Sequence, residues 1–239
     1  MRNCGKIIII ACLLCFAAFA ALAEGMEEVA EETPTPKYIC LTFDDGPSVY
    51  TKSILNILEE NNVRATFCVL GERVKQYQAE IERALALGCE VIGHSWDHTM
   101  LPNLTNEQIE KQITRTYEAI ESVIGKPPLM IYRAPGGTTS PRLLKLSEEL
   151  GFMLLHWTAG SNDYALLDAK KIHDAVYYNT RSGSIMLCHD LYGATVKAMR
   201  TVIPKLLSEG YKFVTISEYM EIYGDEIVPG MIYRGHEER

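Results

Sequence analysis

Two adjacent carboxylates stand in the segment LTFDDGP, residues 41–47, where an apolar run meets a Gly-Pro turn. Like charges this close raise each other's energy, so Asp44 and Asp45 are a costly way to continue a strand. Asp-Asp-Gly-Pro is also good turn chemistry, and taken alone the segment is explained equally well as a turn. The alternative is that each acid has its own chemical role.

Two histidines follow with a spacing that suits a metal ion, in the segment IGHSWDH. His94 and His98 are four residues apart, which on a helical turn would place both rings on one side. Two imidazoles and one carboxylate form a set of three ligands that leaves positions open for water and substrate, as a catalytic zinc or another divalent transition metal requires. A single such pair is often coincidental, so the prediction depends on what accompanies it.

Three later segments carry further polar side chains: Arg133 in YRAPGG, Asn162 and Asp163 in HWTAGSNDY, and His189 with Asp190 in IMLCHD. Each has an ordinary explanation. Arg133 is explained as a surface cation, Asp163 as a helix cap and His189 as a core histidine with its hydrogen bonds satisfied.

The apolar pattern predicts the elements that must position these residues. We expect strands at 38–43, 65–70, 90–93, 129–132, 152–157, 184–189 and 213–216. We expect helices at 49–60, 73–87, 105–124, 141–150, 169–180 and 195–207, the third opening on a capping box, Thr105 with Gln108. Seven strands alternating with helices predict an α/β fold of parallel βα units, either a barrel or an open sheet, in a single domain.

Chemistry in such folds gathers at the carboxyl ends of the strands. The five motifs follow the first, third, fourth, fifth and sixth predicted strands in order, and five unrelated explanations would have to produce that arrangement by chance. A metal held there lowers the pKa of bound water to about 7 and polarises a carbonyl. The acid that does not bind the metal can take the water's proton, and Arg133 can hold that acid ionised.

His189 comes from another strand and can protonate a leaving group, with Asp163 tuning the pKa of its ring. Glycines after Arg133 allow a backbone N–H to approach an oxyanion closely. This set of groups predicts a metal-dependent hydrolase acting on an amide or ester.

The beginning of the chain predicts export. Arg2 and Lys6 precede an apolar run, 7–20, and Ala21-Leu22-Ala23 offers small residues at a cleavage site. We therefore predict a signal peptide at 1–23, an acidic linker without regular structure at 24–36 and one catalytic domain at 37–239. The predicted location is secreted or cell-envelope associated, with an uncleaved N-terminal anchor as the alternative and no membrane span in the mature chain.

Composition and net charge limit the classes of binding partner. The chain of 239 residues has 47% hydrophobic residues and a net charge of −8 with no basic run, so nucleic acid is an improbable partner. A neutral sugar polymer is compatible with this charge, and a monomer is favoured. Four of the seven cysteines, Cys40, Cys68, Cys89 and Cys188, lie beyond the predicted signal peptide within apolar runs. We interpret them as buried thiols, with pairing between neighbouring strands as the alternative.

The segments TFDDGP, HSWDH, RAPGG, SNDY and LCHD, in this order, resemble the five motifs of the polysaccharide deacetylase family, carbohydrate esterase family 4, over residues 37–216. The resemblance implies a distorted (β/α) barrel. It also implies that Asp45, His94 and His98 are the metal ligands and that Asp44 is the catalytic base.

The resemblance implies roles for the later motifs as well. Arg133 matches the arginine that binds the base, and Asp163 matches the acid that tunes His189. The backbone N–H of Gly136 matches the group that completes the oxyanion hole. The side chains that match the wall around the acetyl methyl group are Tyr164 and Leu187.

Three positions depart from the family pattern: Gly136 where a tyrosine is common, Gly160 where an aspartate stands, and Tyr164 where a tryptophan stands. All three concern substrate recognition. None removes a metal ligand or the acid–base pair.

The predicted function is removal of N-acetyl groups from N-acetylglucosamine-type sugars of peptidoglycan or chitin-like oligomers, so the predicted partner is an acetylated polysaccharide or oligosaccharide. The cofactor is one divalent transition metal, Zn²⁺ in the first place, with Co²⁺, Ni²⁺ or Mn²⁺ as alternatives. Other functions considered are an O-acetyl esterase acting on xylan, a wall-binding protein without turnover, and an amidase acting on small cyclic substrates.

Overall fold

The computed structural model describes residues 36–126 and 128–236. The predicted signal peptide and almost all of the predicted linker lie outside these residues, so both stay predictions. Within the described part of the chain, no helix is long and apolar enough to cross a membrane.

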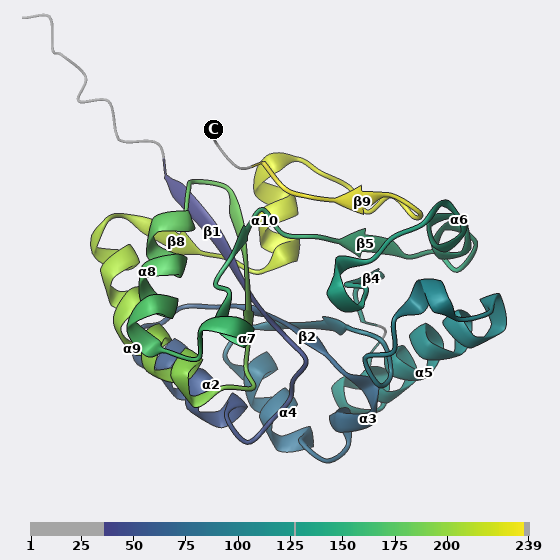
Figure 1. Cartoon of the computed structure of the whole chain (residues 1–239), viewed down its shortest axis with the longest axis horizontal. Helices are drawn as coiled ribbons and strands as arrows, with labels where there is room; N and C mark the ends of the chain where they lie inside the picture. The colour runs from purple at the N-terminus through teal and green to yellow at the C-terminus, as the bar shows by residue number, and fades with distance from the viewer. Residues whose placement is uncertain (1–35, 127, 237–239) are drawn as a thin grey trace, which may run out of the picture. The chain divides into compact units, whose positions relative to one another are not determined.

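A curled sheet of parallel strands forms the centre of the fold (Figure 1). The strands are β1 (Lys37–Asp44), β2 (Thr66–Val69), β3 (Glu90–Gly93), β4 (Ile131–Tyr132), β5 (Met153–Leu155), β6 (Ala159–Gly160), β7 (Ser184–His189), β8 (Tyr211–Phe213) and β9 (Ile232–Tyr233). Their order in the sheet is β6-β7-β1-β2-β3-β4-β5-β9, and β8 pairs with the beginning of β1. The predicted α/β class and distorted barrel are confirmed.

The helices surround this sheet. They are α2 (Thr51–Glu60), α3 (Gly71–Val74), α4 (Gln78–Ala86), α5 (Asn106–Ile124), α6 (Pro141–Glu149), α7 (Asp163–Leu166), α8 (Ala169–Asn179), α9 (Gly193–Ser208) and α10 (Ile216–Tyr223). Neighbouring helices contact one another in the order α8, α9, α2, α4 and α5, so they follow the curve of the sheet (Figure 1). The predicted capping box at Thr105 and Gln108 is present at the beginning of α5.

The alternation of side chains along β1 divides the interior into two layers. Ile39, Leu41 and Phe43 pack in the cluster between strands and outer helices. Cys40 belongs to a second cluster, with the side chains of β3, β4, β5 and α10, on the other face of the sheet. Since the side chains of a strand alternate between faces, Asp44 shares the face of Cys40 and ends the strand inside the curve of the sheet. All four described cysteines are buried and unpaired, as predicted.

Several elements differ from the prediction. The helix expected at 73–87 is divided into α3 and α4, and β6 and β9 were not predicted because two residues leave no periodicity. The strand expected at 213–216 ends at Phe213, because Thr215 and Glu218 form a capping box that begins α10 at Ile216.

Candidate active site

The register of the sheet brings four motifs to one edge. Asp44, the last residue of β1, pairs with His189, the last residue of β7. Gly93 at the end of β3 pairs with Tyr132 at the end of β4, so the residues that follow both strands leave the sheet side by side. The parallel strands therefore place the predicted site residues together, as the sequence indicated.

Asp45, His94 and His98 converge on one point. The Oδ1 atom of Asp45 lies 3.2 Å from Nε2 of His94 and 3.3 Å from Nε2 of His98, and one ligand atom from each residue lies within 4.8 Å of the others. Nδ1 of His94 hydrogen-bonds to the carbonyl oxygen of Arg133 at 2.8 Å, which makes Nδ1 the protonated nitrogen and leaves Nε2 as a lone-pair donor.

This set of donors fits a divalent metal ion. Oδ1 of Asp45 is buried and has no hydrogen-bond donor among the described residues. Burial of an unpaired carboxylate oxygen is unfavourable in free energy unless a cation lies beside it. Burial alone would raise the pKa of Asp45, but the neighbouring imidazoles of His94 and His98 outweigh burial and lower it. Two imidazole nitrogens and one carboxylate oxygen are ligands that Zn²⁺ and related ions accept.

The two histidines reach this point through a loop, so the predicted helical turn is wrong. Residues 94–100 contain no helix, and Ser95 and His98 have left-handed backbones with φ of 68° and 65°. The loop is held by its own hydrogen bonds, among them His98 N–H to Ser95 Oγ at 3.1 Å. Asp45 is also left-handed, with φ of 68°. Non-glycine residues adopt this conformation at a cost, and such strain concentrates at functional sites.

The carboxylate of Asp44 is hydrogen-bonded to the guanidinium of Arg133. Nη1 of Arg133 donates to Oδ1 of Asp44 at 2.6 Å and to Oγ1 of Thr42 at 2.8 Å. Arg133 is fully buried, so the surface-cation explanation is wrong. Burial by itself would lower the pKa of Arg133, but the charge of Asp44 raises it. The other oxygen of Asp44, Oδ2, lies 3.8 Å from Nε2 of His94.

His189 lies near Oδ2 of Asp45, whereas His94 and His98 lie near Oδ1. Its Nδ1 lies 2.6 Å from Oδ1 of Asp163, and its Nε2 lies 4.0 Å from Oδ2 of Asp45. Asp163 is fully buried and also accepts from the backbone N–H of His189 and from Oγ1 of Thr195, each at 2.8 Å. Burial would lower the pKa of His189, but the hydrogen bond and charge of Asp163, with smaller effects of Asp44 and Asp45, raise it above its ordinary value.

Comparisons with known proteins identify the family of the chain. The sequence model of the polysaccharide deacetylase family matches residues 31–155, slightly more than half of the chain. The chain belongs to the polysaccharide deacetylase family.

Individual relatives cover more of the chain. It is 36% identical over 200 residues to the peptidoglycan-N-acetylglucosamine deacetylase PgdA of Listeria monocytogenes, which covers 83% of this chain and 41% of that protein. The chain therefore corresponds to about two fifths of the length of that relative. It is similar to the structure of the peptidoglycan deacetylase PdaC from Bacillus subtilis, with 35% identity and a TM-score of 0.76 over 80% of this chain and 93% of the other.

A third relative is an acetyl xylan esterase from Clostridium thermocellum, whose structure contains a cobalt ion. It has 34% identity and a TM-score of 0.77, over 83% of this chain and 98% of that chain.

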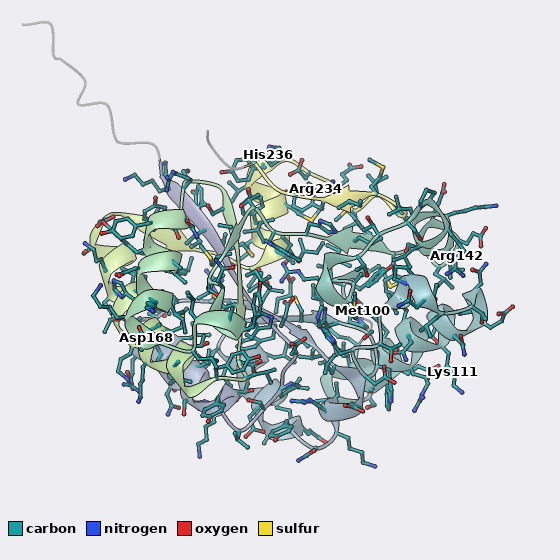
Figure 2. All side chains as sticks on the ribbon, in the orientation of Figure 1. Met100, Lys111, Arg142, Asp168, Arg234 and His236 are labelled. Atoms are coloured by element: carbon teal, nitrogen blue, oxygen red, sulfur yellow. The ribbon has the colours of Figure 1, made fainter. Side chains whose placement is uncertain are left out.

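The residues that the family motifs assign to substrate binding lie around His189 and Arg133. The ring of Tyr164 stands edge-on to His189 with centroids 5.9 Å apart, and its side chain is 60% exposed. Leu187 is half-buried on β7. Gly136 has φ of 61°, and the terminal methyl carbon of Met100 (labelled in Figure 2) lies 3.2 Å from the position that a Cβ at residue 136 would take.

Further residues contribute to the site without having been predicted. Thr195, on α9, donates to Asp163, the Thr42 hydroxyl accepts from Arg133, and the carbonyl of His156 accepts from Nη2 of Arg133 at 3.3 Å. Thr195 lies outside the quoted segments, Thr42 was given no role, and residue type does not indicate the part played by a backbone carbonyl.

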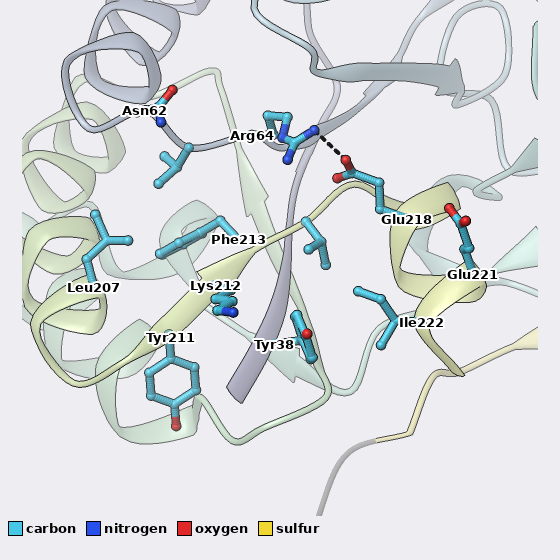
Figure 3. Close-up of a pocket in the computed structure, with 12 residues that line it drawn as sticks. Tyr38, Asn62, Arg64, Leu207, Tyr211, Lys212, Phe213, Glu218, Glu221 and Ile222 are labelled. Carbon is cyan, nitrogen blue, oxygen red and sulfur yellow. Dashed lines mark hydrogen bonds and ion pairs between the residues drawn. The ribbon is translucent and has the colours of Figure 1, made fainter. Parts of the chain in front are cut away.

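The hollow of about 510 Å³ in Figure 3 lies away from this site. It is lined by Tyr38 near the beginning of β1, whereas Asp44 ends that strand. Its charged groups include an ion pair between Arg64 and Glu218. The convergent imidazoles and carboxylates, and not this hollow, make the candidate active site.

Proposed function

We propose that this chain is an exported, metal-dependent hydrolase that removes N-acetyl groups from N-acetylglucosamine-type sugars of peptidoglycan or chitin-like oligomers. The observation that carries the proposal is the arrangement of two further groups around Asp45, His94 and His98. Asp44, hydrogen-bonded to Arg133, lies 3.8 Å from Nε2 of His94, and His189, hydrogen-bonded to Asp163, lies 4.0 Å from Oδ2 of Asp45. Relatives named as peptidoglycan deacetylases support the choice of substrate.

Asp45, His94 and His98 would hold the metal, with Zn²⁺ as the first choice and Co²⁺, Ni²⁺ or Mn²⁺ as alternatives. A divalent metal in such a site supplies a Lewis acid that polarises a carbonyl and makes water acidic. The remaining steps belong to side chains of this chain.

Asp44 accepts a proton from the water that attacks the acetyl carbonyl carbon. The Arg133 guanidinium orients Asp44, because the two are joined by a hydrogen bond within a buried environment. Gly136 would offer its backbone N–H to the oxygen that becomes negative, a role that a glycine permits because the backbone can approach closely.

His189 donates a proton to the amide nitrogen as the C–N bond breaks, so that the sugar leaves as a neutral amine. Asp163 keeps the ring charged and in one orientation. Tyr164 and Leu187 lie beside His189 and would contact the acetyl methyl group.

Release of acetate from a panel of substrates tests this function. We expect N-acetylglucosamine oligomers or peptidoglycan to yield acetate and free amine, and the Asp44→Asn variant to yield neither at a comparable rate. The second candidate is an O-acetyl esterase, which the similarity to the acetyl xylan esterase favours. Acetate release from acetylxylan alone would decide for that alternative. Absence of turnover on every substrate would favour a wall-binding protein.

A further inference from the structure

A buried carboxylate that the proposed reaction does not use lies directly behind the site. Asp190 follows His189 and is fully buried. Its Oδ2 accepts a hydrogen bond from Oγ1 of Thr51, and its backbone carbonyl accepts one from Oγ of Ser48. Ser48 N–H in turn donates to Oγ1 of Thr51 at 2.7 Å. These contacts tie the turn between β1 and α2 to the end of β7.

The same carboxylate lies against the backbone next to a predicted metal ligand. A Cβ added to Gly46 would overlap both carboxylate oxygens of Asp190, so any side chain at position 46 would require the buried Asp190 carboxylate to move. On its other side, the carbonyl of Gly46 accepts from the N–H of Leu70 at 2.8 Å, just after β2. The backbone that follows Asp45 is therefore held between two neighbours of β1.

Asp45 needs such support. Its left-handed backbone is a conformation that persists when the surrounding structure imposes it. Asp190 is itself expensive to bury, since its Oδ1 has no hydrogen-bond partner among the described residues and burial raises its pKa to about 7. Asp190 is buried in spite of this desolvation, and its contacts are with the turn that carries Ser48 and Thr51. These contacts indicate that Asp190 stabilises the turn.

We propose that Asp190 is a positioning residue for the metal centre: through Thr51 and Ser48 it holds the turn that fixes Asp45 opposite His94 and His98. The inference rests on the proposed function, because it assumes that these three residues bind a metal. Asp190 follows β7, whereas the turn that it would hold follows β1.

The affinity of the purified, metal-depleted protein for Zn²⁺ tests the proposal, measured by competition with a chromophoric chelator. Thr51→Val preserves the shape of the side chain and removes the hydroxyl, and we expect affinity to fall by roughly 10–100-fold, as for other partners of metal ligands. Thr51→Ser retains the hydroxyl and should bind Zn²⁺ as the wild type does. Asp190→Leu should lower affinity at least as much as Thr51→Val.

Thr180→Val is the matched control. Thr51 and Thr180 are each 3% exposed. Thr180 lies between α8 and β7, and its hydroxyl donates to the carbonyl of Val176 in α8. We expect this variant to lose thermal stability without losing affinity for Zn²⁺.

Wild-type affinity in Thr51→Val would overturn the inference, and so would an equal loss in Thr180→Val. Wild-type protein that binds no Zn²⁺ would overturn the metal centre itself, and with it the inference. That result is distinguishable from the other two because it concerns the unmutated chain.

Discussion

The ring of His189 lies between two carboxylates, with Nδ1 2.6 Å from Oδ1 of Asp163 and Nε2 4.0 Å from Oδ2 of Asp45. The first contact is a short hydrogen bond to a buried acid, and the second leaves room for another group. One nitrogen is therefore committed to the protein and the other faces the site.

The pH dependence of the reaction should depend on Asp163. Burial acts to lower the pKa of His189, but Asp163 raises it, so the ring keeps its proton to a higher pH than an ordinary imidazole. A general acid works while protonated, and its contribution is lost as pH rises through its pKa. Asp163→Asn removes the charge that raises this pKa, so the alkaline fall in kcat should begin at lower pH. The measurement is a pH–rate profile of acetate release.

The control for this profile is Asp174→Asn, which removes an exposed partner of Lys170 and should leave the profile unchanged. An alkaline limb that stays in place in Asp163→Asn would show that His189 does not act as the acid through this pair.

The metal requirement should depend on the three predicted ligands. We expect a strong chelator to abolish activity and added Zn²⁺ to restore it, with one ion bound per chain. His98→Ala should lower metal content, measured by elemental analysis, because a set of three protein ligands loses one. His173→Ala is the matched control, since His173 is half-buried far along the chain from the three predicted ligands and hydrogen-bonds to Thr201 between α8 and α9. Equal metal content in His98→Ala and the wild type would contradict the ligand assignment.

Substitution of Asp44 and substitution of Asp45 should have different effects, the first on kcat and the second on metal affinity. Asp44→Asn should retain the metal while kcat falls by roughly 10²–10⁴, the size of a general-base contribution. Asp45→Asn should instead lose metal affinity. If Asp44→Asn loses the metal and recovers its rate when metal is added in excess, then the roles of the two acids are reversed.

Arg133 should contribute to stability as well as to catalysis. Asp44 and Arg133 are 3% and 0% exposed, so Arg133→Met leaves a carboxylate buried without its partner. Breaking a buried pair in this way costs about 3–5 kcal/mol of unfolding free energy. Denaturant titration of the metal-free protein measures it, so that metal binding does not contribute to the difference.

The surface pair Lys170 and Asp174 supplies the comparison, with Asp174→Asn expected to cost about 0–1 kcal/mol. A loss in Arg133→Met no larger than this would mean that Asp44 finds another donor or becomes neutral.

The sequence predicted the parts of the site that depend on strand ends. Asp44 and His189 were placed at strand ends correctly because largely apolar segments, 38–43 and 185–188, mark β1 and β7, and parallel strands end at one edge. The loop carrying His94 and His98 was not predicted, because a spacing of four residues fits a helical turn as well as a loop with two left-handed residues. The burial of Arg133 was also hidden, since its depth depends on β4, only two residues long, and on the curvature of the sheet.

The pairing of Asp44 with His189 across β1 and β7 has a consequence for how this site tolerates change. Neighbouring strands are held about 4.7–4.9 Å apart by their backbone hydrogen bonds, so the main chain sets the spacing of the proposed base and the proposed acid. A slip of one residue would turn every side chain of β1 to the other face. The register therefore fixes the separation of the two backbone positions, and under the proposed function substitutions in the surrounding loops would alter which sugar is accepted while this spacing stays constant.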